Sequence, residues 1–236
     1  MHRFSAYSVR ESLVANRPLP LWTLAGRVLT EIMQRSHSTI PVTVIGSAAY
    51  DFDEQGRMKE ATERTGAMLR QFPVVTLVTG GMPAVGVDTG AAFCGKDTYS
   101  APLYHVLPEH HGMELPEQGR VVLAGRSFGE RQFALGMTAK ISVLIGGGPG
   151  ATREANVVLK SGGILLPIGS TGGAASGDAW GLDDPLENQV DLQLARRIAV
   201  EDNGMAEEDW AGLTSSHTEV EQAIRSISTM IRQVID

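Results

Sequence analysis

The residues best placed to do chemistry surround a glycine-rich segment, residues 146–150. No regular element tolerates this density of glycine, so the segment is predicted to be a tight turn. The apolar run 141–145 before it is typical of a buried strand, and residues 151–160 after it are predicted to form a helix. Such a turn presents free backbone N–H groups beside the positive end of a helix, which favours a phosphate. The expected ligand-binding residues of this turn are Gly147, Gly148, Gly150, Ala151 and Thr152.

Two arginines and one glutamate add charged groups to this region. Arg126 and Arg131 follow a short predicted strand, residues 120–124. A planar guanidinium grips phosphate well, although exposed arginines also form ordinary surface pairs. Glu154 falls in the first turn of the predicted helix, where the macrodipole stabilises an acid even without a catalytic role. We therefore treat all three as candidate site residues.

Small residues follow three other predicted strands, residues 41–45, 74–78 and 162–168. The carboxyl ends of parallel strands meet at one edge of a sheet, so these turns are expected to face the same ligand. The second turn could instead serve close packing, and the third could be a flexible connection. His105, inside a strand predicted at 102–107, is interpreted as a packed residue. The expected ligand-binding residues in the three turns are Gly46, Ser47, Gly80, Gly81, Thr171, Gly172 and Gly173.

Segment 131–154 resembles the LONELY GUY-like proteins, once labelled lysine decarboxylases, of the SLOG group of Rossmann-like nucleotide-binding domains. That family carries the motif Pro-Gly-Gly-x-Gly-Thr-x-x-Glu, with an arginine upstream at the start of a helix. Gly146 replaces the motif's proline, and Ala151 replaces its threonine. The resemblance extends more weakly over residues 41–175. Residues that match the family are Arg131, Gly147, Gly148, Gly150 and Glu154.

Strands alternate with helices along the chain, and no linker-like stretch divides it. This pattern predicts an α/β fold: a single Rossmann-like three-layer domain, with a mainly parallel sheet of about six or seven strands and helices on both faces. We expect residues 1–40 to form an N-terminal arm and packing helix, 41–175 the nucleotide-binding core, and 176–236 a C-terminal helical extension packed on the core. Within that extension, residues 186–200 are predicted to form one helix.

The last helix is the clearest in the sequence. Thr218 and Glu221 form a capping box, and an apolar stripe runs from Val220 to Val234. This stripe predicts packing either on the sheet or on a second subunit.

The composition of the sequence excludes several classes of protein. The 236 residues are 42% hydrophobic and 20% charged, which describes a globular chain, and the net charge of −7 argues against nucleic-acid binding. No apolar run has the length of a membrane span, and the N-terminus lacks a signal-peptide core. Cys94 is the single cysteine, so a cysteine metal cluster is excluded and a reducing cytoplasm is the expected location. No metal and no resident cofactor are expected.

Three functions remain open, and the sequence leaves undecided whether the protein is an enzyme. The preferred one is binding of a nucleotide or nucleotide-derived ligand, as a sensor or carrier without efficient turnover. The resemblance implies a second, a phosphoribohydrolase that cleaves the N-glycosidic bond of a nucleoside 5′-monophosphate, with Glu154 and Arg131 as catalytic residues. A third is a carrier of a larger phosphorylated cofactor such as molybdopterin. The expected partners are a small phosphorylated molecule and, from the resemblance and the surplus terminal helices, further copies of the chain; nucleic acid and membranes are not expected.

Overall fold

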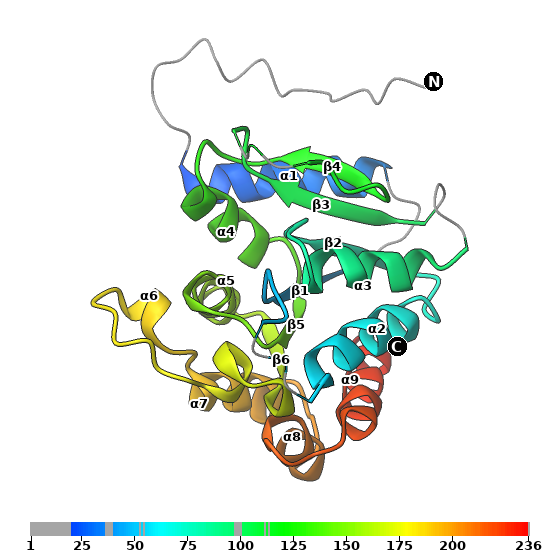
Figure 1. Cartoon of the computed structure of the whole chain (residues 1–236), viewed down its shortest axis with the longest axis vertical. Coiled ribbons are helices and arrows are strands. Elements are labelled where there is room, and N and C mark those ends of the chain that lie inside the picture. Colours follow the sequence, from blue (N-terminus) through cyan, green and yellow to red (C-terminus); the bar gives the residue numbers. More distant parts are fainter. Residues whose placement is uncertain are drawn as a thin grey trace.

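The computed structural model describes residues 20–35, 40–51, 53, 55–96, 101–110, 112 and 114–235. The N-terminal arm expected at residues 1–19 lies outside these ranges. The described chain forms one parallel sheet of six strands in the order β4-β3-β2-β1-β5-β6, as Figure 1 shows. This confirms the predicted Rossmann-like α/β domain. The strands are β1 (Ile40–Gly46), β2 (Val75–Thr79), β3 (Leu103–Leu107), β4 (Arg120–Leu123), β5 (Ile141–Ile145) and β6 (Ile164–Ile168).

The interior strands are mostly apolar because helices cover both faces of the sheet. Every residue of β5 is buried. Its one polar side chain, Ser142, lies against Thr43 of β1, and their hydroxyl groups share a hydrogen bond. A mostly apolar run that ends at a cluster of glycines was therefore a sound signal for a central strand.

Helices lie in two layers. One face of the sheet carries α1, α4 and α5, and the other carries α2, α3 and α9, as Figure 1 shows. Among the described residues, no helix is long and apolar enough to cross a membrane. The helices of the two layers are α1 (Leu21–Arg35), α2 (Arg57–Leu69), α3 (Val85–Cys94), α4 (Phe128–Gly136), α5 (Pro149–Lys160) and α9 (Val220–Ile235).

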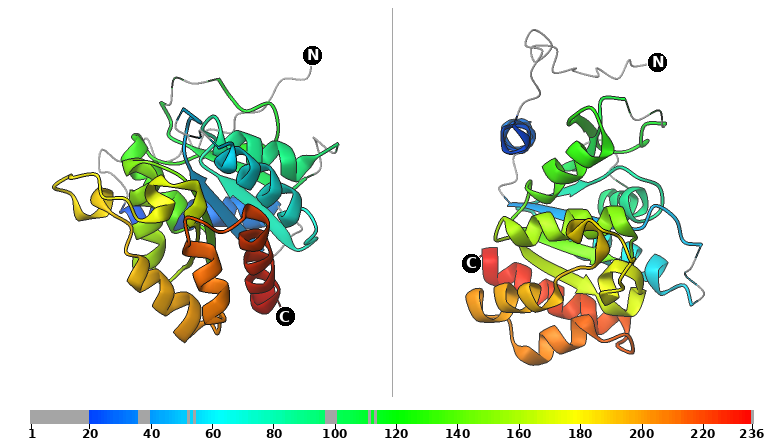
Figure 2. Two further views of the ribbon diagram at one scale, coloured as in Figure 1. Left: turned by 60° about the horizontal axis from the view of Figure 1, so that its bottom comes forward. Right: turned by 90° about the vertical axis from the view of Figure 1, so that its left-hand side faces the viewer.

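The C-terminal stripe is covered within the chain. Helix α9 packs against α2 and against α8 (Glu207–Thr214), which itself contacts β6. Figure 2 shows α8 and α9 side by side. Ile227 and Ile231 of α9 are fully buried there, so intramolecular packing accounts for the apolar stripe.

The helix predicted over residues 186–200 is wrong in one respect, because it is interrupted. The structure has α6 (Pro185–Asn188), then α7 (Leu192–Arg196), which continues as a π-helix over Arg197–Asp202. Asn156 of α5 holds the break open: its Nδ2 donates to the carbonyls of Leu186 and Gln189, and its Oδ1 accepts from the Asp191 N–H. A tertiary contact of this kind overrides local helical periodicity.

The strand order creates a crevice. From β1 the chain adds β2, β3 and β4 on one side, whereas β5 and β6 lie on the other. Loops that leave β1 and β5 therefore diverge at the carboxyl edge of the sheet, which is where open α/β sheets bind ligands.

Candidate functional site

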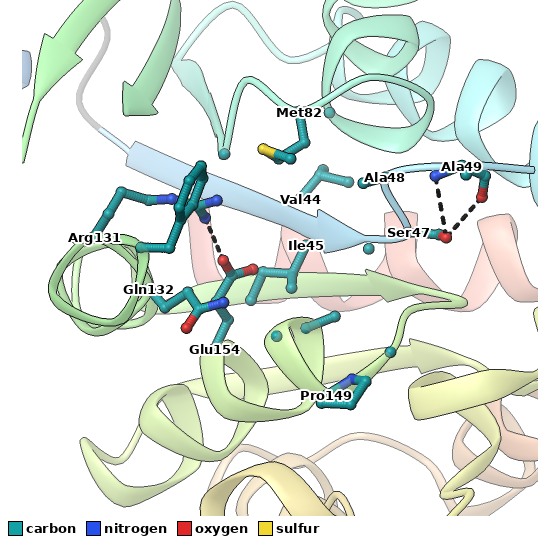
Figure 3. A pocket seen from close by; sticks show the side chains of 17 residues that line it. Val44, Ile45, Ser47, Ala48, Ala49, Met82, Arg131, Gln132, Pro149 and Glu154 are labelled. Atoms are coloured by element: carbon teal, nitrogen blue, oxygen red, sulfur yellow. Dashed lines mark hydrogen bonds and ion pairs between the residues drawn. The ribbon is translucent and has the colours of Figure 1, made fainter. Parts of the chain in front are cut away.

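A pocket of about 360 Å³ occupies this crevice, as Figure 3 shows. Its walls come from the end of β1 and the loop after it, the loop between β2 and α3, helix α4, and the glycine turn with the first two turns of α5. The lining residues are Val44, Ile45, Gly46, Ser47, Ala48, Ala49, Gly80, Met82, Gly86, Phe128, Arg131, Gln132, Gly148, Pro149, Gly150, Ala151 and Glu154.

The start of α5 supplies hydrogen-bond donors to the pocket. Gly148 is the N-cap, and its carbonyl accepts from the Thr152 N–H at 2.9 Å. Pro149 follows in the first turn, where its fixed φ suits a helix and its missing N–H costs nothing. The N–H groups of Gly150 and Ala151 precede the hydrogen-bond ladder of the helix, so they are the donors that a helix start offers to an anion.

The backbone of the glycine turn explains one departure from the resembled family. Gly146 has φ of +56° and Gly147 has φ of +100°, both in the left-handed region. Proline is locked near −65°, so the family's proline cannot adopt the conformation found at position 146. A Cβ on Gly146 would also lie 2.6 Å from Cε of Met58. The turn therefore requires glycine here.

Arg131 of α4 and Glu154 of α5 form an ion pair on the wall of the pocket, between Nη1 and Oε1. Figure 3 shows the guanidinium directed at the carboxylate. Both side chains are buried, with exposed fractions of 3% and 7%. Burial raises the pKa of Glu154, and the charge and hydrogen bond of Arg131 oppose this only in part. Nε of Arg131 is buried and has no hydrogen-bond partner among the described residues.

Gly80 makes room for this arginine. A Cβ on Gly80 would lie 2.8 Å from Nη1 of Arg131. The ring of Phe128 flanks the guanidinium on the same helix, 5.6 Å from Cζ to the ring centroid. The turn after β2 and the start of α4 thus fix the position of one cation at the pocket.

Eight of the fifteen residues expected from the sequence line the pocket together. They come from four separate segments, which supports the reasoning that turns after parallel strands meet at one edge. These residues are Gly46, Ser47, Gly80, Arg131, Gly148, Gly150, Ala151 and Glu154.

The remaining seven lie outside the lining of this pocket. Arg126 is exposed, and its backbone N–H donates to Oε2 of Glu130 at 2.6 Å. The Thr152 hydroxyl donates to the Gly148 carbonyl and accepts from Nε1 of Trp180. The Thr171 hydroxyl is likewise engaged with backbone. The residues outside the lining are Gly81, Arg126, Gly147, Thr152, Thr171, Gly172 and Gly173.

Nine of the lining residues were not predicted from the sequence, and three of them, Met82, Phe128 and Gln132, add long or aromatic side chains. Phe128 and Gln132 belong to the same helix as Arg131, at positions i−3 and i+1, and Met82 lies in the turn after β2. Phe128 is 39% exposed. Helical spacing from Arg131 was the available signal for Phe128. No comparable signal marked Met82, because its direction depends on the course of an irregular turn.

His105 is packed, as expected, and it also supports a pocket turn. Its Nε2 donates to the Gln118 carbonyl at 2.9 Å, so its Nδ1 accepts from the Thr79 hydroxyl at 2.7 Å. Oγ1 of Thr79 in turn accepts from the Gly81 N–H. Burial lowers the pKa of His105 to about 4, so the ring is neutral at physiological pH. Within the described residues, no group of three or more His, Cys, Asp or Glu could hold a metal ion.

Comparisons with known proteins extend the assignment of the fold. No family model matches this sequence, and no curated protein matches it. Among solved structures, the protein TM1055 is similar with a TM-score of 0.55 and 18% identity, covering 81% of this chain and 99% of its own. The molybdenum cofactor carrier protein of Chlamydomonas reinhardtii has a TM-score of 0.50 and 16% identity, covering 82% and 99%. The molybdenum cofactor binding protein of Rippkaea orientalis has a TM-score of 0.50 and 15% identity, covering 83% and 99%. At these identities the likeness establishes a Rossmann-like fold.

Proposed function

We propose that the pocket binds a nucleotide or another small phosphorylated ligand by its phosphate, and that the protein is a carrier or sensor without efficient turnover. One observation carries the proposal. The open N–H groups at the start of α5 and the buried cation of Arg131 line the same pocket, at the switch point of the sheet. Helix starts and arginines are both well suited to hold phosphate.

The shape and lining of the pocket support a small organic phosphate. A volume of about 360 Å³ falls within the range of small-molecule sites. Phe128 and Met82 add apolar wall beside the polar turn, as a ligand with a phosphate and an apolar or aromatic body requires. A bare inorganic anion would leave that wall without a partner.

The state of Glu154 supports binding without turnover. A hydrolase needs an ionised carboxylate opposite the developing positive charge on the sugar. Here the carboxylate is buried, and its charge is already paired with that of Arg131. Ala151 also lacks the hydroxyl that the resembled family places at the start of this helix. Both features weaken the case for efficient cleavage.

A phosphoribohydrolase is the second candidate, and one specific observation favours it. Arg131 and Glu154, the residues that match the family's catalytic pair, line the same pocket as the glycine turn. In that reaction Glu154 would stabilise the oxocarbenium-like centre at the ribose, and Arg131 would hold the substrate. Free base released from a nucleoside monophosphate would establish this activity.

A larger phosphorylated cofactor is the third candidate. Two of the structures with a similar fold are those of a molybdenum cofactor carrier protein and a molybdenum cofactor binding protein. Molybdopterin as cargo would place its phosphate on the same donors at Gly150 and Ala151, and its ring system along the apolar wall. Such a ligand belongs in the same binding experiment.

The test is native mass spectrometry of the purified protein, followed by titration calorimetry with matched ligands. We expect a nucleoside 5′-monophosphate or another phosphorylated ligand to bind at least tenfold more tightly than its dephosphorylated counterpart, because the phosphate occupies the charged end of the pocket. Equal binding of a nucleoside and its monophosphate would contradict a phosphate site. Released base in the same samples would favour the hydrolase.

A further inference from the structure

The loop that follows β6 forms hydrogen bonds to the glycine turn. We call these hydrogen bonds the brace, and the loop the bracing loop. The Gly146 N–H donates to Oγ1 of Thr171 at 2.7 Å. The N–H of Ala175 donates to the Gly146 carbonyl at 3.1 Å, and that of Ala174 donates to the Gly147 carbonyl at 2.9 Å. Three hydrogen bonds from residues 171–175 therefore engage two successive glycines of the turn.

Thr171 occupies the centre of this brace, and its hydroxyl has a defined role. The side chain is buried, and the hydroxyl proton goes to the Ile168 carbonyl at 2.6 Å. An oxygen lone pair is then left to accept from Gly146. Because Ile168 ends β6, the acceptor is anchored to the sheet rather than to a free loop. Both hydrogen bonds of the hydroxyl go to backbone groups, and Thr171 does not line the pocket.

The brace selects one backbone conformation from many. Glycine visits positive and negative φ with similar ease, so Gly146 and Gly147 have little intrinsic preference for the values they adopt. The three bonds engage both backbone polar groups of Gly146 and the carbonyl of Gly147 with residues that do not line the pocket. The donors left facing the pocket belong to the next residues, at the start of α5. A turn ordered in advance costs a ligand less conformational entropy than a mobile one.

The small residues of the bracing loop serve close packing. A Cβ on Gly173 would lie 2.4 Å from the Gly147 carbonyl oxygen, and Gly173 also has φ of +59°. A Cβ on Gly169 would lie 2.2 Å from the carbonyl oxygen of Thr214 in α8. Glycine at these positions lets the bracing loop approach the turn on one side and α8 on the other.

We propose that Thr171 is a positioning residue, whose hydroxyl preorganises the glycine turn for a phosphate. The effect on affinity rests on the proposed function, whereas the effect on the turn does not. Removing the hydroxyl leaves the Gly146 N–H without its buried acceptor, and frees the turn to sample conformations in which its donors no longer converge.

Three variants test this. Thr171→Val removes the hydroxyl at nearly constant volume, and Thr171→Ser keeps it. Thr138→Val is a matched control, because Thr138 is also buried and donates to a backbone carbonyl, that of Ala134, at 2.7 Å. Amide hydrogen exchange reports the turn directly. Calorimetry with a nucleoside 5′-monophosphate reports affinity, and thermal unfolding reports global stability.

In the wild type we expect slow exchange at Gly146, although its N–H lies outside the helix and strand ladders. In Thr171→Val we expect exchange at Gly146 to be at least tenfold faster than in Thr138→Val, and affinity for the monophosphate to fall about tenfold. Thr171→Ser should restore both. If the role of the Thr171 hydroxyl were purely structural, Thr171→Val and Thr138→Val would change exchange at Gly146 and affinity for the monophosphate to the same extent.

The outcomes separate the two proposals. Wild-type exchange at Gly146 as fast as at an open loop amide overturns the brace, even if Thr171→Val does not fold. Unchanged exchange or unchanged monophosphate affinity in Thr171→Val overturns the positioning role. If wild type binds no phosphorylated probe while exchange at Gly146 responds as expected, the proposed function fails and the ordering of the turn by Thr171 stands.

Discussion

Arg131 and Glu154 form an ion pair almost wholly removed from water, and it joins α4 to α5 on the pocket wall. Such a pair gives little net stability compared with apolar residues, but loss of one partner strands the other charge in the interior. The pair therefore couples the packing of two helices to the chemistry of the pocket. The contribution of the pair to the free energy of unfolding can be measured separately from ligand binding.

The first prediction concerns this coupling. Arg131→Met should lower the free energy of unfolding by about 3 kcal/mol, because Glu154 must remain charged without a partner or take up a proton. The double variant Arg131→Met, Glu154→Leu should recover most of that loss. Urea denaturation of the single and double variants measures both values.

A surface pair provides the control. Arg64 lies 2.7 Å from Glu60 and 3.3 Å from Glu221, and all three side chains are about half exposed. Arg64→Met should cost less than about 1 kcal/mol, as exposed pairs usually do. Equal losses at Arg64 and Arg131 would show that the burial of the second pair has no energetic consequence.

The sequence was sufficient to predict the central unit. A continuous apolar run, a cluster of glycines and a helix could be read directly, because β5, the turn and α5 are adjacent in the chain. Arg131 and Glu154 were both predicted as site residues, through the resemblance to the LONELY GUY-like proteins, but their ion pair was not predicted. Their approach within one pocket follows from parallel strands that share a carboxyl edge.

The directions of side chains in loops could not be predicted from the sequence. Thr171 stands at a strand end among glycines, and the same pattern suits a ligand contact or a backbone brace. Only tertiary structure shows that its hydroxyl points to Gly146. Arg126 and Arg131 likewise looked alike, five residues apart, yet one is exposed and the other buried. Their difference depends on how α4 docks against α5.

The second prediction concerns pH. The pKa of His105 is lowered from its ordinary value of 6.5 to about 4, so the unfolded chain binds more protons between these values. The contribution of His105 to stability is therefore complete above about pH 6.5 and is lost as pH falls towards 4. The loss should reach about 3 kcal/mol. Urea denaturation at several pH values, in wild type and in His105→Gln, isolates it; parallel pH profiles would contradict it.

The third prediction concerns backbone strain beside the pocket. Ala84, just before α3, has φ of +57° and ψ of −115°, a conformation that is unfavourable for any residue with a Cβ. Ala84→Gly should therefore raise the free energy of unfolding by about 1 kcal/mol. Ala91→Gly, at an exposed position inside the same helix, should lower it by about 1 kcal/mol. A lower free energy of unfolding in both variants would argue against strain at Ala84.

The fourth prediction concerns the space beside Arg131. Gly80 lies outside the left-handed region, so Gly80→Ala introduces a steric contact with Nη1 and little backbone strain. The displaced guanidinium should weaken monophosphate binding by about tenfold, a cost of 1.4 kcal/mol. Gly129→Ala on α4 is the control, because its added Cβ would meet only Oγ of Ser127 at 3.9 Å. Titration calorimetry on both variants decides whether the position of Arg131 matters for the ligand.

The last prediction separates carrier from hydrolase. At high enzyme concentration, we expect the wild type to leave the common nucleoside 5′-monophosphates intact, because Glu154 is buried and already paired with Arg131. Glu154→Gln should then change affinity alone, whereas Arg131→Ala should weaken binding, since in the proposed complex the charge of Arg131 contacts the bound ligand. Chromatography of free base, beside calorimetry, measures both properties. Suppose instead that wild type releases base, and that Glu154→Gln abolishes release while binding persists. The carboxylate would then be stabilising positive charge at the sugar, since the amide keeps its size and hydrogen-bonding capacity but not its charge. That result would show that the protein is an N-glycosidase and not a carrier.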